Sequence, residues 1–264
     1  MVKQALCVGI NNYPGTKSDL SGCVNDARDW AQELGARGYR VKVLLDKQAT
    51  RRAIVSALTK LVTGAVAGDS LVFTYAGHGS WLPDDDDDEL DGRDEMLCPY
   101  DVGDEQYLLD DDLAKIFKKK ARGARLYFIS DSCHSGSVTR FAADPLSSAG
   151  RMPKIRLLPP LEFVKDKKTR ERVALASRTS RSSRGEAYPA LLLSGCKDVE
   201  FSYDADFDGR PNGAMTRAAL EALRQDPATP QEWFRAIRAR LPSQMYPQTP
   251  QLFGGREAKT GPMF

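Results

Sequence analysis

The stretch Leu71-Val-Phe-Thr-Tyr-Ala-Gly-His78-Gly-Ser80 joins a hydrophobic run to a glycine-flanked histidine, one of only two histidines in the chain. Its length and its β-branched and aromatic residues predict a buried strand over Ser70–Tyr75. The pattern recurs in Leu126-Tyr-Phe-Ile-Ser-Asp-Ser-Cys133-His-Ser-Gly136, which predicts a strand over Arg125–Ser130. Each strand therefore leads into a turn that carries a reactive side chain.

Around these two strands, the chain alternates between strand and helix patterns. We expect four further strands, at Gln4–Ile10, Tyr39–Leu45, Ala190–Leu193 and Gln248–Phe253, and helices at Cys23–Leu34, after Thr50, at Leu113–Phe117, at Ala214–Leu223 and after Thr229. Such alternation predicts an α/β fold with a mostly parallel sheet and right-handed crossovers. Ligands of such sheets bind beyond the carboxyl ends of the strands, where both reactive turns lie.

Composition indicates a soluble, globular protein of 264 residues, with 41% hydrophobic and 28% charged residues. No apolar run approaches the eighteen or so residues that would cross a membrane, and the N-terminal apolar stretch is too short for a signal peptide. The five cysteines form no CxxC pair, which favours free thiols in a reducing compartment. We therefore expect a cytoplasmic protein with no membrane partner.

Charge is unevenly distributed along the chain. Nine carboxylates fall between Asp84 and Glu95, and eleven Lys or Arg residues against three acids fall between Arg151 and Arg184. Both blocks could be solvated surface loops. We do not expect nucleic-acid binding, because only Phe163 interleaves the basic residues.

The proline-containing stretch 144–189 predicts a long exposed basic linker. On this view residues 1–264 form one domain, in which the linker joins a catalytic part, 1–143, to a smaller part, 190–264. The linker's basic residues would be a target for any protease that cuts after Arg or Lys.

Cys133 and His78 form the pattern of a cysteine nucleophile and its base. A thiol with an ordinary pKa near 8.5 is mostly protonated at neutral pH and needs a base beside it. The two residues are 55 positions apart, so the fold has to bring the two turns together. His134 adjoins the cysteine and is expected to point away from it and shape the turn. The backbone N–H groups of Gly79 and Cys133 are natural donors to an oxyanion.

Several segments in the same order resemble the metacaspases, which are caspase-like cysteine proteases. They are Gly9-Ile-Asn-Asn-Tyr-Pro-Gly15, Gly22-Cys-Val-Asn-Asp26, Tyr75-Ala-Gly-His-Gly-Ser80, Asp91-Gly-Arg-Asp-Glu95, Leu109-Asp-Asp-Asp112, Asp131-Ser-Cys-His-Ser-Gly136 and Leu192-Leu-Ser-Gly-Cys-Lys-Asp198. The resemblance implies a caspase-like three-layer sandwich, with six or more strands and helices on both faces of the sheet. It also implies Cys133 and His78 as the catalytic dyad.

The resemblance further implies cleavage after Arg or Lys, with Asp26 and Asp131 in the specificity pocket and Cys23 and Ala76 beside them. A carboxylate at the base of a pocket would pair with a basic side chain and repel an acidic one. Read without the family, Asp131 could simply accept backbone N–H groups, and Asp26 could cap its helix or face solvent. Cys23 could equally be helix packing.

A calcium site is the second expectation from the resemblance, with carboxylate ligands at Asp94, Asp110 and Asp111. Hard oxygen ligands suit Ca²⁺ better than zinc or copper. A further family carboxylate falls where this chain has Arg140, whose charge could replace the metal's, unless Asp144 substitutes.

The expected partners are proteins or peptides with Arg or Lys at the cleavage site, and the expected oligomeric state is a monomer. A different class of function stays open. The chain could be a catalytically silent caspase-like scaffold that binds protein partners through its charged loops.

Overall fold

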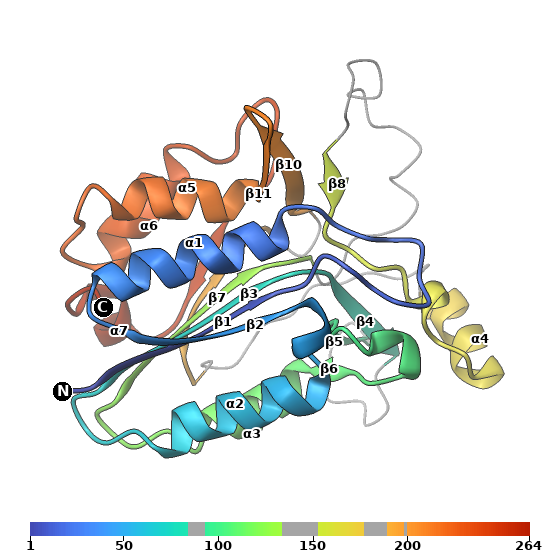
Figure 1. Cartoon of the computed structure of the whole chain (residues 1–264), viewed down its shortest axis with the longest axis horizontal. Helices are drawn as coiled ribbons and strands as arrows, with labels where there is room; N and C mark the ends of the chain where they lie inside the picture. Colours follow the sequence, from blue (N-terminus) through green and yellow to red (C-terminus); the bar gives the residue numbers. More distant parts are fainter. Residues whose placement is uncertain (84–92, 134–152, 177–188, 198–199) are drawn as a thin grey trace.

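A six-stranded sheet forms the centre of the molecule (Figure 1). The chain is represented by a computed structural model, which describes residues 1–83, 93–133, 153–176, 189–197 and 200–264. The strand order is β12-β9-β7-β3-β1-β2, and only β12 runs antiparallel to its neighbour. The bounds are β1 Lys3–Gly9, β2 Arg40–Leu45, β3 Ser70–Ala76, β7 Arg125–Asp131, β9 Leu191–Ser194 and β12 Gln251–Phe253.

Helices cover both faces of this sheet (Figure 1). One face is covered by α1 Cys23–Ala36, α5 Ala214–Leu223 and α6 Pro230–Arg238, and the other by α2 Arg51–Thr63 and α3 Asp110–Phe117. Side chains alternate along a strand, so Leu71 and Phe73 of β3 pack on the α2 face while Val72 packs on the α1 face. The predicted three-layer sandwich is confirmed.

The predicted helix starts are also confirmed. The Thr50 side chain accepts a hydrogen bond from the Ala53 N–H at the start of α2, and the Thr229 side chain accepts one from the Glu232 N–H at the start of α6. These hydrogen bonds satisfy backbone donors that have no partner within the helix. The α6 cap differs in one detail from a capping box, because the Glu232 carboxylate accepts from Ala228 N–H rather than from Thr229 N–H.

Two small antiparallel sheets, which the sequence patterns did not predict, lie beyond the carboxyl ends of the central strands (Figure 1). One contains β4 Gly79–Pro83, β5 Arg93–Leu97 and β6 Leu108–Leu109. The other contains β8 Lys154–Ile155, β10 Tyr203–Phe207 and β11 Arg210–Gly213. The first begins directly after His78, so both sheets frame the edge where the reactive turns lie.

The prediction of an exposed basic linker is wrong for the part around Arg156, whereas most residues of 165–175 are exposed as predicted. Arg156, Leu157 and Leu158 are almost completely buried, and the chain continues through a short 3₁₀ helix, Pro160–Glu162, into α4 Lys167–Ala176. The physical reason is that Arg156 finds buried carboxylate partners from distant segments, so its charge does not force it to the surface. The rest of the linker, 144–152 and 177–188, lies outside the described residues.

The five cysteines all fall within described stretches, and each is a free thiol, as predicted. In the part of the chain that the structure describes, no helix has the length and hydrophobicity needed to span a membrane.

Candidate active site

The turns that carry His78 and Cys133 meet at one edge of the central sheet, as predicted. In the β3–β7 pair, Ala76 lies opposite Asp131, and each reactive residue follows its strand by two positions. Both side chains are buried. The two turns converge on a single acceptor, because Gly79 N–H and Cys133 N–H both donate to the backbone carbonyl of Arg156, at 3.0 and 3.1 Å.

This pair of donors has the geometry of an oxyanion hole. Two backbone N–H groups that point at one carbonyl oxygen stabilise the negative charge that develops there during attack on the carbonyl carbon. Gly79 and Cys133 are the two donors that the sequence predicted. The carbonyl that accepts from both donors is that of Arg156, which lies in the stretch predicted to be an exposed linker.

The Cys133 thiol contacts the backbone of Ser202, just before β10. Its sulfur accepts a hydrogen bond from Ser202 N–H at 2.6 Å and lies 3.5 Å from the Ser202 carbonyl. Leu157 and Cys196 pack against it. A hydrogen bond to Cys133 and burial raise the pKa of the Cys196 thiol, so Cys196 stays protonated beside the predicted nucleophile.

The two nitrogens of His78 have different surroundings. Nε2 lies 2.5 Å from the Ser18 carbonyl, which can only accept, so Nε2 carries the proton. Nδ1 is buried and has no hydrogen-bond partner among the described residues. The Tyr13 hydroxyl accepts from His78 N–H at 2.7 Å, and the two rings lie 4.7 Å apart. Nδ1 is therefore the nitrogen of His78 that can accept a proton, while the Cys133 sulfur has its hydrogen-bond contacts with Ser202.

Burial lowers the pKa of His78 to about 4, against the opposing effect of the nearby Ser18 and Arg156 carbonyls. Desolvation disfavours the charged imidazolium. At neutral pH, and with Arg156 in place, His78 is thus uncharged, which is the form that can act as a base.

The pKa of His78 predicts a specific loss of stability in acid. Between about pH 6.5 and pH 4, His78 is protonated in the unfolded chain and neutral in the folded chain. The free energy of unfolding therefore falls as the pH falls through this window. We compare Cys133→Ala with the double variant that also carries His78→Gln. Between pH 7.5 and 4.5, the free energy of unfolding of Cys133→Ala should fall by roughly 2–3 kcal/mol more than that of the double variant. Urea unfolding at both pH values measures this difference, and all other titrating groups cancel. Parallel pH profiles for the two variants would contradict the assignment.

The Arg156 side chain enters a pocket lined by three buried carboxylates. Its guanidinium lies 2.5 Å from Asp26, 3.0 Å from Asp204 and 3.1 Å from Asp131. Asp26 lies in α1, Asp131 at the end of β7 and Asp204 in β10. Asp26 and Asp131 were predicted for such a pocket, whereas Asp204 was missed, since no pattern in its own segment distinguishes it from other strand residues.

Backbone and side-chain donors also satisfy these carboxylates. Asp26 accepts from Gly213 N–H, and Asp131 accepts from the N–H and hydroxyl of Thr216. The interpretation of Asp131 as an acceptor of backbone N–H groups is therefore confirmed, and the same carboxylate also pairs with Arg156. Burial raises the pKa of Asp26 to about 6 against the effect of Arg156, while the three carboxylates outweigh desolvation and raise the pKa of Arg156.

Gly213 provides the space for this arrangement. A Cβ atom at that position would lie 2.2 Å from a carboxylate oxygen of Asp131 and 2.6 Å from a nitrogen of Arg156. Any larger residue would fill the volume that the guanidinium occupies.

The remaining predicted pocket residues lie nearby. Cys23 is buried at the first turn of α1, where the charges of Arg156 and its acidic partners act on its thiol, and Ala76 is buried at the end of β3. His134, Arg140 and Asp144 lie outside the described residues.

The expected calcium ligands lie on neighbouring elements. Asp94 is on β5, and Asp110 and Asp111 begin α3 directly after β6, the partner of β5. Asp111 pairs with Lys115 at 2.7 Å. Within the described ranges, no three His, Cys, Asp or Glu side chains group to hold a metal ion, and most of the acidic run, 84–91, falls outside those ranges. The described residues alone thus do not fit a calcium site.

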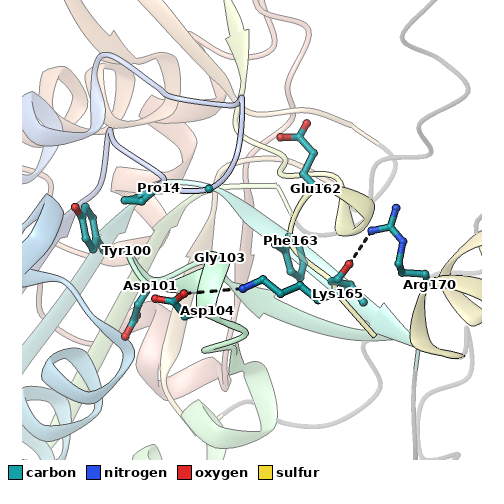
Figure 2. Close-up of a pocket in the computed structure, with 11 residues that line it drawn as sticks. Pro14, Tyr100, Asp101, Gly103, Asp104, Glu162, Phe163, Lys165 and Arg170 are labelled. Atoms are coloured by element: carbon teal, nitrogen blue, oxygen red, sulfur yellow. Dashed lines mark hydrogen bonds and ion pairs between the residues drawn. The ribbon is translucent and has the colours of Figure 1, made fainter. Parts of the chain in front are cut away.

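A cavity of about 550 Å³ lies between the Pro14 loop, residues 100–104 and residues 162–170 (Figure 2). Its lining mixes charges: Lys165 approaches Asp104 at 4.0 Å, and Arg170 donates to the Val164 carbonyl at 2.7 Å. It contains none of the predicted site residues. The space between His78, Cys133 and the acidic pocket is filled instead by the chain around Arg156.

Comparison with known proteins places this chain among caspase-like peptidases. A family model described as metacaspase, peptidase C14 domain, matches residues 3–142. Metacaspase-1 of Cryptococcus neoformans var. neoformans is 34% identical over 297 residues, covering 99% of this chain and 64% of that protein. Metacaspase-1A of Aspergillus fumigatus is 33% identical over 282 residues, covering 95% of this chain and 68% of that protein. The chain thus spans about two thirds of the length of these relatives.

Solved structures agree with this placement. The crystal structure of a protein from Geobacter sulfurreducens matches with a TM-score of 0.74 and 29% identity, over 98% of this chain and 97% of that one. Caspase-1 from Spodoptera frugiperda matches with a TM-score of 0.57 and 14% identity, over 96% and 86%, which shows the fold alone. Because the family model spans more than half of the chain and includes both reactive turns, the chain belongs to the metacaspase family of caspase-like cysteine peptidases.

Proposed function

We propose that this chain is a cysteine endopeptidase that cleaves peptide bonds after Arg or Lys, with Cys133 as nucleophile and His78 as base. One observation carries the proposal. Arg156 sits with its guanidinium among three buried acids while its carbonyl accepts from Gly79 N–H and Cys133 N–H. An arginine in this position occupies the place of the residue before a scissile bond.

The proposed steps assign one role to each of these groups. His78 Nδ1 takes the proton of Cys133, and the thiolate attacks the carbonyl carbon of the bound Arg or Lys. The oxyanion is stabilised by the Gly79 and Cys133 N–H groups. His78 then protonates the leaving amine, and water hydrolyses the thioester to release the acid and restore the thiol. The Ser18 carbonyl fixes the tautomer that presents Nδ1.

Charge sets the specificity. The pocket holds three carboxylates around one cation, so an acidic side chain would meet only repulsion there and a neutral one would leave buried acids without a partner. The planar guanidinium group of arginine can donate hydrogen bonds to several carboxylates at once. Lysine, with a single ammonium group, should be accepted with lower efficiency.

A positional library of fluorogenic peptides tests this function. We expect turnover with Arg, less with Lys, and none with Asp or Glu at the position before the cleaved bond. A library profile that favours acidic or apolar residues would contradict the proposed specificity. A purified, folded chain that hydrolyses no member in calcium or in chelator would instead favour the silent-scaffold alternative.

Calcium activation is a separate part of the proposal, with Asp94, Asp110 and Asp111 as contributors to a site that further acids would have to complete. We expect a chelator to lower peptide turnover and added Ca²⁺ to restore it. Asp94→Asn should raise the calcium concentration needed for half-maximal activity, whereas Asp104→Asn, in the cavity of Figure 2, should not. Equal activity in calcium and chelator would contradict this part alone.

Self-processing in the basic linker completes the proposal. The linker contains many Arg and Lys residues, and one of them already lies in the acidic pocket.

A further inference from the structure

Two tyrosine hydroxyls hold the backbone of His78 at both of its polar groups. Tyr13 lies in the loop between β1 and α1, and Tyr75 lies in β3, so the two hydroxyls reach one turn from different elements. The Tyr13 hydroxyl accepts from His78 N–H at 2.7 Å, and the Tyr75 hydroxyl donates to the His78 carbonyl at 2.8 Å. Both side chains are almost fully buried, where a hydrogen bond is stronger than in water.

Burial also fixes the protonation state of these hydroxyls. It raises the pKa of Tyr13 and of Tyr75 well above the ordinary value for tyrosine, so neither loses its proton near neutral pH. A protonated Tyr75 can donate, and the His78 and Cys98 carbonyls both lie 2.8 Å from its oxygen. The Tyr75 hydroxyl therefore ties the turn at His78 to the residue that follows β5.

The contact at the His78 carbonyl also orients an oxyanion donor. This carbonyl and Gly79 N–H belong to one planar trans peptide group, so they point in opposite directions. The Tyr75 hydroxyl and Cys98 N–H, at 2.8 and 3.0 Å, both donate to the carbonyl. Gly79 N–H then points the other way, where it donates to the Arg156 carbonyl at 3.0 Å. Holding the plane of this peptide group thus sets the direction of Gly79 N–H.

The contact at His78 N–H orients the predicted base. It holds the preceding peptide group, between Gly77 and His78, while the Tyr13 ring packs against the imidazole with centroids 4.7 Å apart. The same loop supplies the Ser18 carbonyl to Nε2. Tyr13 is itself held, because its N–H donates to the Asp19 carboxylate at 2.8 Å. The loop therefore contacts His78 at its backbone, its ring and its Nε2 atom.

Gly77 shows how closely the two hydroxyls approach this turn. A Cβ atom at Gly77 would lie 2.6 Å from the Tyr13 oxygen and 2.7 Å from the Tyr75 oxygen. Glycine allows such a close approach because it has no side chain. A larger residue at this position would displace both hydroxyls from the backbone that they hold.

We infer that Tyr75 and Tyr13 are positioning residues for the reaction. Tyr75 directs Gly79 N–H at the oxyanion, and Tyr13 orients the imidazole of His78. Both act through the backbone of the His78 turn. The inference rests on the proposed function, because it uses the same base and the same oxyanion donor. It adds the two hydroxyls that hold these groups in the orientation that the chemical step needs.

Tyr75→Phe tests the first role, since it removes the hydroxyl and keeps the ring. Cys98 N–H still donates to the His78 carbonyl, so the peptide group should be loosened rather than reversed. Loss of a whole oxyanion donor lowers kcat about 10²–10³-fold, so misalignment of one should lower kcat about 10–10²-fold. Steady-state kinetics on an arginine-terminated fluorogenic peptide measures this change.

Two inhibitors distinguish a misdirected donor from a damaged pocket. A peptide aldehyde ending in arginine adds the Cys133 thiol across its carbonyl group, and the resulting oxygen lies at the oxyanion donors. Agmatine has the guanidinium group of arginine and no carbonyl. In Tyr75→Phe, the Ki of the aldehyde should rise about 10-fold or more, while the Ki of agmatine should stay within about twofold of wild type.

Tyr13→Phe tests the second role. It keeps the ring against the imidazole and removes the acceptor of His78 N–H. A whole general base contributes about 10²–10⁴-fold, so a misoriented one should lower kcat about 10-fold. Alkylation of Cys133 by iodoacetamide at pH 7, followed by mass spectrometry, should slow as well, because that reaction needs a thiolate but no oxyanion donor.

Tyr39→Phe is the matched control. The Tyr39 hydroxyl is also buried and lies 2.7 Å from the Ser70 hydroxyl, but at the amino end of β3, away from His78. Urea unfolding should show similar losses of stability in Tyr39→Phe and Tyr75→Phe, while Tyr39→Phe keeps the kcat of wild type.

Three outcomes would contradict these expectations in different ways. If Tyr75→Phe and Tyr13→Phe kept the kcat of Tyr39→Phe, the inference would be overturned while the proposed function stood. Equal losses of aldehyde and agmatine binding in Tyr75→Phe would also overturn it, because the pocket itself would have changed. A folded wild-type chain that hydrolyses no arginine peptide would overturn the proposed function, and the inference with it.

Discussion

Replacing Cys133 with alanine should lower kcat/KM for an arginine-terminated fluorogenic peptide by about 10⁴-fold or more, the scale seen when a covalent nucleophile is removed. The sulfur is the proposed nucleophile, and it belongs to the residue whose own N–H, together with Gly79 N–H, donates to the Arg156 carbonyl. The two N–H groups survive the substitution, so binding should persist while the chemical step is lost. Steady-state kinetics on chains purified to the same monodispersity give the ratio.

The matched control is Cys196→Ala, which removes the thiol that packs against Cys133. Burial and the Cys133 hydrogen bond keep the Cys196 thiol protonated, so it should contribute packing rather than attack. We expect this variant to stay within about tenfold of wild type, the range of packing changes that leave the reacting groups in place. If Cys196→Ala were as inactive as Cys133→Ala, or if Cys133→Ala kept its activity, the nucleophile would be misassigned.

Replacing Asp26 with asparagine should remove most of the discrimination between arginine and citrulline, a neutral side chain of nearly the same shape. Asp26 lies closest to the guanidinium, at 2.5 Å, and both groups are fully buried. Breaking a buried ion pair costs about 3–5 kcal/mol, so the ratio of kcat/KM for arginine over citrulline peptides should fall roughly 10²–10³-fold. Asparagine keeps an oxygen for Gly213 N–H, which limits damage to the fold.

Asp29→Asn is the control for this prediction. Asp29 lies one turn further along α1 and pairs with Arg210 at the surface, with 25% of its side chain exposed. Exposed pairs of this kind contribute about 1 kcal/mol or less, so selectivity should stay near wild type. A loss of arginine preference in Asp29→Asn equal to that in Asp26→Asn would mean that the effect comes from distortion of α1 rather than from charge in the pocket.

The central strands and most helices were predictable because they depend on residues close together in the chain. Continuous apolar runs such as Leu71–Phe73 identify strands buried on both faces, and Thr50 and Thr229 mark helix starts through hydrogen bonds to N–H groups three positions away. The parallel order of the strands then followed from the alternation with helices. That the two reactive turns meet was also predictable, because each follows the carboxyl end of a parallel strand and these ends lie at the same edge of the sheet.

The small sheets and the path of the linker were not predictable on this basis. The strand β8 has two residues, too few for any periodic pattern, and it forms only because β10 offers an edge. In its local sequence, Arg156 does not differ from the other basic residues of the stretch. Its burial depends on Asp26, Asp131 and Asp204, which lie 130, 25 and 48 positions away and meet only in the folded chain.

Local sequence was therefore enough to predict a parallel α/β sheet with a cysteine and a histidine at its carboxyl edge, while the resemblance to a family indicated Asp26 and Asp131 as neighbours of that edge. The folded chain alone established Asp204 as the third acid, His78 Nδ1 as a buried nitrogen without a partner among the described residues, and Arg156 as the cation between the acids. The physical reason is the distance along the chain over which each kind of interaction acts. Hydrogen-bonding and hydrophobic periodicity act between residues a few positions apart and leave a pattern in the sequence, whereas a buried charge is stabilised by whichever distant groups the topology places around it.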